Sequence, residues 1–122
     1  MDISDKVDVL IYLVSFIVLV NILAVCVRLK NEYFSALQNR YLRRLSKWDD
    51  LGEYEKVVKH VDLYIREFPG ETNFKWLKAR SLYKLGKYDD ALEIYKEIDR
   101  DEPLYSDDAQ KYIANIESKT NA

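Results

Sequence analysis

Side chains of the kinds that carry out catalysis or bind metals are sparse in this sequence. His60 is the only histidine and Cys26 the only cysteine, so the chain can form no histidine pair, no cysteine cluster and no intrachain disulfide. We expect His60 to be a solvated surface side chain. Acidic pairs such as Asp89-Asp90 stand where a helix is expected to begin, and first-turn acids favour that position. We therefore predict no enzymatic activity and no bound cofactor or metal.

The charge is unevenly distributed along the chain, although its net value is only −2. The region from Arg28 to Trp48 carries six bases and a single acid, whereas 17 acids and 12 bases follow from Asp49 to the end. Domains that bind nucleic acid usually cluster their bases over the folded surface. The acidic balance of the C-terminal region therefore argues against nucleic acid. We expect proteins and membrane lipids as partners, and no small-molecule substrate.

The segment from Val9 to Val27 is apolar over 19 residues and contains neither a charge nor a proline. As a helix it would extend over about 28 Å, which is close to the hydrocarbon thickness of a bilayer. We predict that residues 1–31 form an N-terminal tail and one transmembrane helix. Because acids precede the segment and bases follow it, the positive-inside rule places the N-terminus outside and the C-terminal domain in the cytoplasm.

Four polar side chains in or beside this segment are predicted to contact a neighbouring transmembrane helix. They are Asp8, Tyr12, Ser15 and Asn21. The first three share one stripe of the helix and Asn21 lies on the opposite side. Hydrogen bonds between spanning helices contribute roughly 1 kcal/mol each. The alternative is that Asp8 and Tyr12 lie among the headgroups, while Ser15 and Asn21 bond to their own backbone.

Leu23-Ala24-Val25-Cys26 offers a different anchor, since it is similar to the lipobox that precedes the lipidated cysteine of bacterial lipoproteins. It departs from that pattern at Val25, where a small residue is expected, and the N-terminus lacks the usual bases. With a lipid on Cys26, the C-terminal domain would be a scaffold outside the cytoplasm. A cleaved secretory signal fits poorly, because the N-terminal residues are acidic and no A-x-A site follows the apolar run.

An internal repeat with a period of 34 residues organises the rest of the chain. The residues that recur at that offset are Leu51 and Leu85, Gly52 and Gly86, Tyr54 and Tyr88, and Pro69 and Pro103. A glycine ends a helix well because it adopts left-handed backbone angles without strain, and a proline stops the next helix. Apolar residues lie on one helical face between these markers, which predicts a helix hairpin in each repeat.

The pattern resembles the tetratricopeptide repeat family, most closely in the second repeat, 72–105. The residues at its signature positions are Ala79, Leu82, Gly86, Tyr88, Ala91, Tyr95 and Pro103. The first repeat, 38–71, keeps Trp48, Gly52, Tyr54 and Pro69 but has Leu45 and Val57 where small residues are usual. The resemblance implies an all-α domain over residues 32–122. It would contain two antiparallel helix hairpins and a C-terminal capping helix over residues 106–119.

In that family, the first helix of each repeat lines a concave groove that binds protein segments. The corresponding positions in the second repeat are Asn73, Trp76, Arg80, Tyr83 and Lys84. Those in the first repeat are Asn39, Leu42, Ser46, Asp49 and Asp50. Trp76 is expected to face outward as an interface anchor, the alternative being that it packs on its neighbours. The lysine and asparagine clamp by which some members hold a C-terminal carboxylate is absent from these positions.

Together these features predict a single-pass membrane adaptor or accessory subunit. Its repeat domain would hold a cytoplasmic protein beside a larger membrane complex. Two alternatives stay open: a membrane receptor that captures peptides or preproteins in the groove, and a lipid-anchored scaffold lipoprotein. All three assign protein binding, and not catalysis, to the repeat domain.

Overall fold

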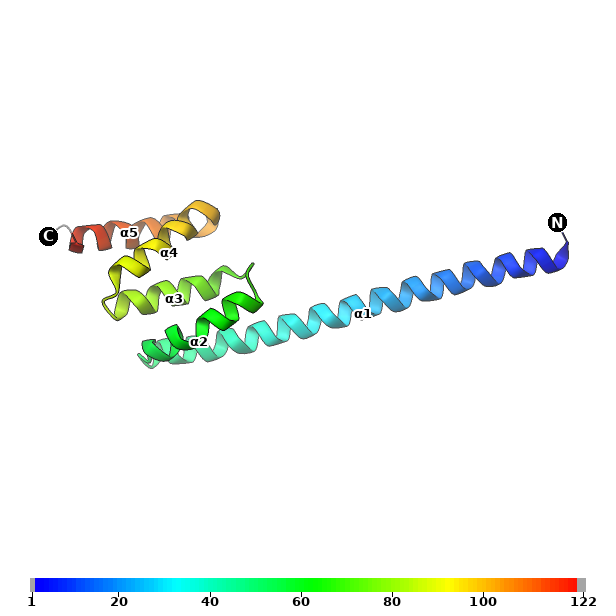
Figure 1. The fold of residues 1–122 in the computed structure, drawn as a ribbon, viewed down its shortest axis with the longest axis horizontal. Coiled ribbons are helices and arrows are strands. Elements are labelled where there is room, and N and C mark those ends of the chain that lie inside the picture. Colours follow the sequence, from blue (N-terminus) through cyan, green and yellow to red (C-terminus); the bar gives the residue numbers. More distant parts are fainter. Residues whose placement is uncertain (1, 121–122) are drawn as a thin grey trace. The chain divides into compact units, whose positions relative to one another are not determined.

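The computed structural model describes residues 2–120, and every regular element in that range is helical (Figure 1). The elements are α1 (Ile3–Asp50), α2 (Tyr54–Glu67), α3 (Thr72–Lys84), α4 (Tyr88–Asp101), the 3-10 turn η1 (Pro103–Tyr105) and α5 (Ser106–Thr120). A long apolar N-terminal helix is thus followed by four shorter helices that pack antiparallel to their neighbours in sequence. The predicted all-α class is confirmed.

Contacts between residues divide the chain into two compact units, one extending to Leu37 and the other beginning at Gln38. The first unit is the N-terminal part of α1. The Ile3 amide donates a hydrogen bond to Asp2 Oδ1 at 2.7 Å, and Asp5 lies in the first turn, where the helix dipole favours an acid.

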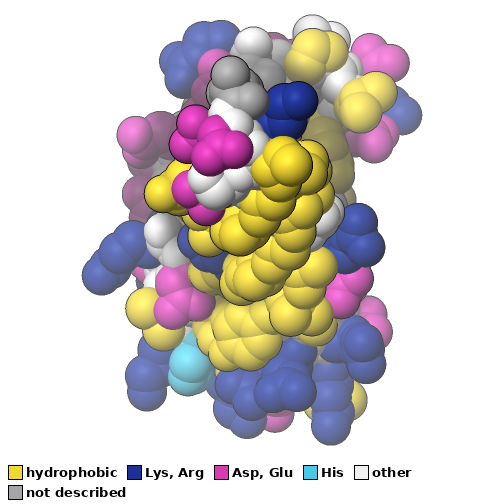
Figure 2. All heavy atoms as spheres, turned by 90° about the vertical axis from the view of Figure 1, so that its right-hand side faces the viewer, with side chains coloured by type: hydrophobic (Ala, Val, Ile, Leu, Met, Phe, Trp, Pro, Cys, Tyr) yellow, Lys and Arg dark blue, Asp and Glu magenta, His cyan; other side chains and the backbone are white. Residues whose placement is uncertain are grey.

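The apolar segment of the first unit buries none of its side chains. Every residue from Val9 to Val27 is exposed, and Figure 2 shows these side chains as a continuous hydrophobic surface. A soluble protein rarely exposes so long an apolar stretch. By length and composition, α1 is the one helix within residues 2–120 that is able to cross a membrane.

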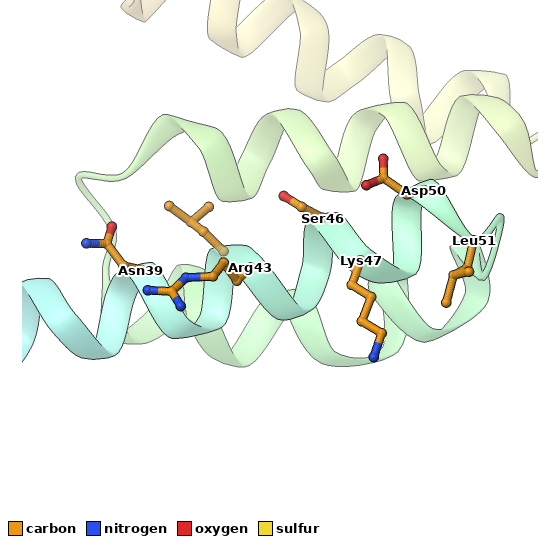
Figure 3. A pocket seen from close by; sticks show the side chains of 7 residues that line it. Asn39, Arg43, Ser46, Lys47, Asp50 and Leu51 are labelled. Carbon is orange, nitrogen blue, oxygen red and sulfur yellow. The ribbon is translucent and has the colours of Figure 1, made fainter.

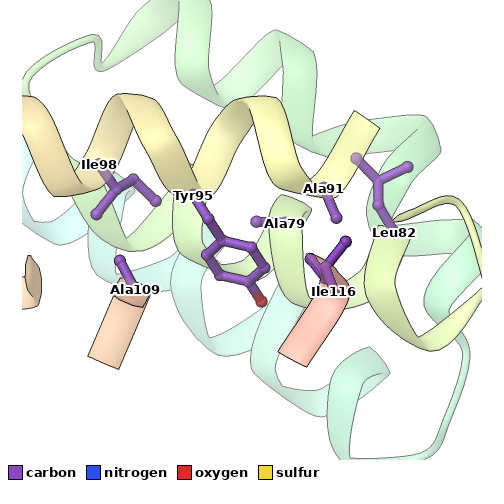
Figure 4. Packing of buried hydrophobic residues seen from close by; sticks show 7 residues of the cluster. All are labelled: Ala79, Leu82, Ala91, Tyr95, Ile98, Ala109 and Ile116. Carbon is purple, nitrogen blue, oxygen red and sulfur yellow. The ribbon is translucent and has the colours of Figure 1, made fainter. Parts of the chain in front are cut away.

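The second unit has a hydrophobic core in two clusters. The cluster nearer the N-terminus contains Leu45, Val57, Val61, Tyr64 and Phe74. The other contains Ala79, Leu82, Ala91, Tyr95, Ile98, Ala109 and Ile116 (Figure 4). The side chains of α3 enter both clusters, since Phe74 belongs to the first and Ala79 to the second. α3 therefore joins the α1–α2 hairpin to the helices that follow it.

The predicted inward faces of α2 and α4 are confirmed. The three predicted positions on each helix are at most 4% exposed; they are Val57, Val61 and Tyr64 on α2, and Ala91, Tyr95 and Ile98 on α4. α5 buries Ala109 and Ile116 in the same way, while its acids and its lysines remain exposed. A helix with one apolar and one polar face can close the end of a helical stack in water.

Two glycines end α1 and α3 with the same turn. Gly52 and Gly86 have φ angles of 75° and 79°, as the sequence predicts. After α1, the Glu53 amide bonds to the Trp48 carbonyl at 2.8 Å, and the Gly52 amide bonds to the Asp49 carbonyl at 3.1 Å. This pair of bonds satisfies carbonyls that a helix end leaves free, and the same pattern follows α3.

Replacing Gly52 or Gly86 by alanine is expected to destabilise the second unit by about 1–2 kcal/mol each, because an L-residue is strained at left-handed angles. Open space surrounds an added Cβ at both positions, so the backbone alone sets the cost. Gly70→Ala is the matched control, because Gly70 has no positive φ and the same open space. Chemical denaturation should show a loss at Gly52 and Gly86 only; an equal loss at Gly70 would contradict the explanation.

Candidate functional site

The predicted groove residues lie on α1 and α3, and the structure gives the two sets different roles. Those on α3, apart from Lys84, make contacts within the chain. Those on α1, apart from the buried Asp49, border a surface hollow. Most of the α3 residues are therefore packing residues, and the α1 residues at the hollow form the candidate site.

Trp76 is half-buried and packs on its neighbours, which was the alternative to an outward-facing anchor. Its ring centroid lies 5.4 Å from that of Tyr95, 5.8 Å from Tyr105 and 5.6 Å from Tyr112. Two of these pairs are edge-to-face, an arrangement that aromatic rings prefer. Trp76 thus links α3 to α4, η1 and α5.

Tyr83 attaches the C-terminal helix to α3. Its hydroxyl donates to Asn115 Oδ1 at 2.8 Å and accepts from Lys119 Nζ at 2.9 Å. The bond to Tyr83 raises the pKa of the Lys119 ammonium, which also lies 4.8 Å above the ring of Tyr83. The ring itself is edge-to-face with Tyr112 at 5.4 Å. Through these contacts Tyr83 packs α5 against α3, so its hydroxyl and ring are already engaged within the chain.

Arg80 forms an ion pair with Asp49, and the pair joins α3 to the end of α1. The distance from Arg80 Nε to Asp49 Oδ1 is 3.4 Å. Asp49 is only 8% exposed, so its carboxylate depends on Arg80 to compensate its negative charge.

The buried hydroxyl of Tyr95 has no hydrogen-bond partner among residues 2–120. Burial raises the pKa of the Tyr95 phenol, which keeps it neutral at physiological pH.

The remaining predicted residues of α3 differ from one another. Asn73 Oδ1 accepts a hydrogen bond from the Tyr105 hydroxyl at 2.9 Å, so this side chain helps to position η1. Lys84 is exposed, and no ion pair joins it to an acid between residues 2 and 120. Of the α3 set, only Lys84 is left fully available to a partner.

The predicted groove residues of α1 come together at a hollow of about 570 Å³. Its lining consists of Asn39, Leu42, Arg43, Ser46, Lys47, Asp50 and Leu51 (Figure 3). Asn39, Leu42 and Ser46 were predicted as groove residues, and Asp50 occupies a further family position. Arg43 and Lys47 were not among the predicted positions. Their spacing of four residues, within a basic stretch, was the signal that could have identified them.

A second hollow, of about 440 Å³, lies between α2, α3 and α4 and includes Asp62, Lys78 and Glu97 in its lining. Lys78 Nζ lies 2.6 Å from Asp62 Oδ1, and Lys75 Nζ lies 3.0 Å from Glu97 Oε1. Asp62, Lys78 and Glu97 are therefore paired within the chain, while Lys87, Asp90 and Glu93 complete the charged lining. The lining of this hollow has more acids than bases, in contrast to that of the α1 hollow.

The predicted membrane contacts Asp8, Tyr12, Ser15 and Asn21 are all exposed on α1. Asn21 borders a hollow of about 320 Å³ on the surface of this helix, together with Val18, Ile22, Val25 and Cys26. Cys26 is exposed within continuous helix. The partners that these side chains would contact are outside this chain, so their role stays a prediction.

His60 was expected to be a solvated surface side chain, but it is half-buried. Its ring centroid lies 4.9 Å from that of Trp48, and its Nδ1 lies 2.9 Å from the Lys56 carbonyl oxygen. It thus helps to pack α2 on α1. Between residues 2 and 120, no three His, Cys, Asp or Glu side chains gather as they would around a metal ion.

Comparison with known proteins does not assign the chain to a family. No family model matches it, and neither a curated protein nor a solved structure matches it. Function must therefore be inferred from the chain's own residues.

Proposed function

We propose that this chain is a single-pass membrane-anchored adaptor, or an accessory subunit of a membrane complex, whose helical unit binds another protein. The observation that carries the proposal is the contrast between its two units. The segment Val9–Val27 exposes every side chain, whereas the unit from Gln38 onward has hydrophobic clusters of its own. An exposed apolar helix in the same chain as a separately packed unit suits an anchor that carries a binding domain.

The charge distribution supports a cytoplasmic helical unit. Asp2, Asp5 and Asp8 precede the apolar segment, and Arg28 and Lys30 follow it. The positive-inside rule then leaves the N-terminus outside and the second unit in the cytoplasm. The exposed Tyr33 lies a few residues beyond the segment, and aromatic side chains favour the headgroup region in that position.

Protein binding is favoured by the repeat itself. Helix hairpins related by 34 residues, with the same glycine turn after α1 and α3, are the construction of tetratricopeptide-like arrays. We include the second unit among such arrays as part of the proposal. The fold alone does not name a partner, so the α1 hollow is proposed as the contact surface.

A photo-crosslinking purification tests this proposal. The full chain, tagged at the C-terminus, would carry a benzophenone amino acid at Ser46 in the α1 hollow, or at the exposed Ala114 of α5 as the control. After irradiation of source membranes and extraction in mild detergent, we expect Ser46 to crosslink to a co-purifying protein and Ala114 not to. Recovery of this chain alone, with no partner and no crosslink, would refute the adaptor function.

A further inference from the structure

One face of α1 in the second unit is strongly basic. Arg40, Arg43, Arg44 and Lys47 occur at i, i+3, i+4 and i+7, and no acid lies between the first and the last of them. This spacing places the four side chains on one side of a helix. We call these four residues the basic face. All of them are exposed.

The basic face is not compensated by the chain's own acids. Seven ion pairs form between Gln38 and Thr120, and none of them includes a residue of the basic face. Arg44 donates to the Tyr64 hydroxyl at 3.5 Å, which leaves its charge unpaired. This is notable because acids outnumber bases from Asp49 onward. Four positive charges therefore lack an acidic partner among residues 2–120 and are accessible to a molecule of opposite charge.

Two residues of the basic face border the α1 hollow. Arg43 and Lys47 line it beside Leu42 and Leu51, with the amide of Asn39 and the hydroxyl of Ser46 nearby. Asp50 is the one acid of the lining, so its two bases leave the hollow with a net positive charge (Figure 3). Apolar contacts and hydrogen-bonding groups next to positive charge suit a peptide that carries both acidic and apolar side chains. Lipid headgroups would use the charges and the hydrogen-bonding groups, whereas the apolar side chains beside them favour a peptide.

We propose that the basic face and the α1 hollow bind an acidic segment of the partner protein, with its carboxylates on Arg43 and Lys47 and its apolar side chains on Leu42 and Leu51. This inference rests on the proposed adaptor function and specifies the chemistry of the partner. Charge complementarity of this kind mainly sets specificity and the rate of association, and it weakens as salt is added.

The binding test uses the full chain in phosphatidylcholine nanodiscs and a fluorescent peptide composed of Glu and Leu. We expect Arg43→Glu with Lys47→Glu to weaken binding on the order of tenfold at low salt. The matched control is Lys59→Glu with Arg66→Glu on α2, which makes the same charge change at exposed bases that form no ion pair with an acid between residues 2 and 120. The control should bind as the wild type does.

Three results would overturn the inference. One is unchanged affinity in the Arg43→Glu, Lys47→Glu variant, and another is an equal loss in the Lys59→Glu, Arg66→Glu control. The third is equal binding of a peptide of Lys and Leu, because that would show that charge is not recognised. Circular dichroism that matches the wild type would show that both charge variants are folded.

Anionic lipid is the other occupant to be tested. Cys26 is the only cysteine, so a dye can be placed at Asn39→Cys in a Cys26→Ser background. If the acidic peptide changes the dye emission in phosphatidylcholine nanodiscs, the inference is supported. If phosphatidylserine nanodiscs change the emission and the peptide does not, the basic face binds headgroups and the inference is wrong.

The failure of this inference can be told apart from failure of the adaptor function. A membrane partner that co-purifies equally with the wild type and with the Arg43→Glu, Lys47→Glu variant would overturn the inference and leave the adaptor function in place. A wild-type chain that co-purifies with no protein would refute the adaptor function itself. Loss of a stoichiometric partner in this variant, but not in the α2 control, would support both.

Discussion

Replacing Phe74 by alanine is expected to lower the free energy of unfolding of the second unit by about 3–5 kcal/mol. Phe74 is fully buried, and its ring centroid lies 5.9 Å from Tyr64 and 6.1 Å from Phe68. It extends from α3 into the cluster formed by α1 and α2. A unit of this size is stable by only about 5–10 kcal/mol, so the cavity should remove much of its stability.

The measurement is guanidinium denaturation of the full chain in mild detergent, followed by tryptophan fluorescence. Both tryptophans, Trp48 and Trp76, belong to the second unit, so the signal reports on that unit. Leu104→Ala is the control, because Leu104 is 94% exposed and its truncation should change stability by no more than about 0.5 kcal/mol. If Phe74→Ala and Leu104→Ala changed the free energy of unfolding equally, the packing of Phe74 between α3 and the α1–α2 hairpin would not stabilise the unit.

Placing two arginines in the apolar segment, as Ile17→Arg with Val18→Arg, is expected to release the chain from the membrane. Fourteen of the 19 residues from Val9 to Val27 are Leu, Ile, Phe or Val. On the insertion scale these contribute roughly 4–8 kcal/mol in favour of insertion, and two central arginines cost roughly 5–7 kcal/mol. The double substitution therefore removes most or all of the driving force for insertion.

Alkaline carbonate extraction of membranes measures this effect. The wild type and the control, Ile17→Leu with Val18→Leu, should remain in the pellet, and the arginine variant should move to the supernatant. Retention of the arginine variant in the pellet would show that the spanning helix is not the anchor. Mass spectrometry of Cys26 would then distinguish a lipid anchor from other attachment, because only lipidation adds an acyl mass there.

The position of α5 explains why the two halves of the predicted groove differ. Trp76 and Tyr83 stand where the sequence predicted partner contacts, but rings and polar groups of α4, η1 and α5 already contact them. Truncating either side chain would disturb packing, so a loss of binding in such variants would not identify a groove. The α1 hollow contains no comparable ring contact, and its substitutions can be interpreted more directly.

Several features of the fold were predictable because they depend on local sequence. The inward faces of α2 and α4 follow from apolar residues at helical spacing, and the left-handed turns follow from Gly52 and Gly86. The apolar stretch Val9–Val27 predicted a helix able to span a bilayer, because its length and composition are local properties too. None of these conclusions requires knowledge of which neighbouring element each side chain contacts.

The roles of individual surface residues depended on the tertiary structure. Whether Trp76 faces solvent is decided by Tyr95, Tyr105 and Tyr112, which approach it from other elements. Asp49 is buried because Arg80, 31 residues later, lies close enough to compensate it. Helical periodicity states which side of a helix a residue occupies, but not which neighbouring helix covers that side. That depends on how the helices stack, and stacking is set by many side chains acting together.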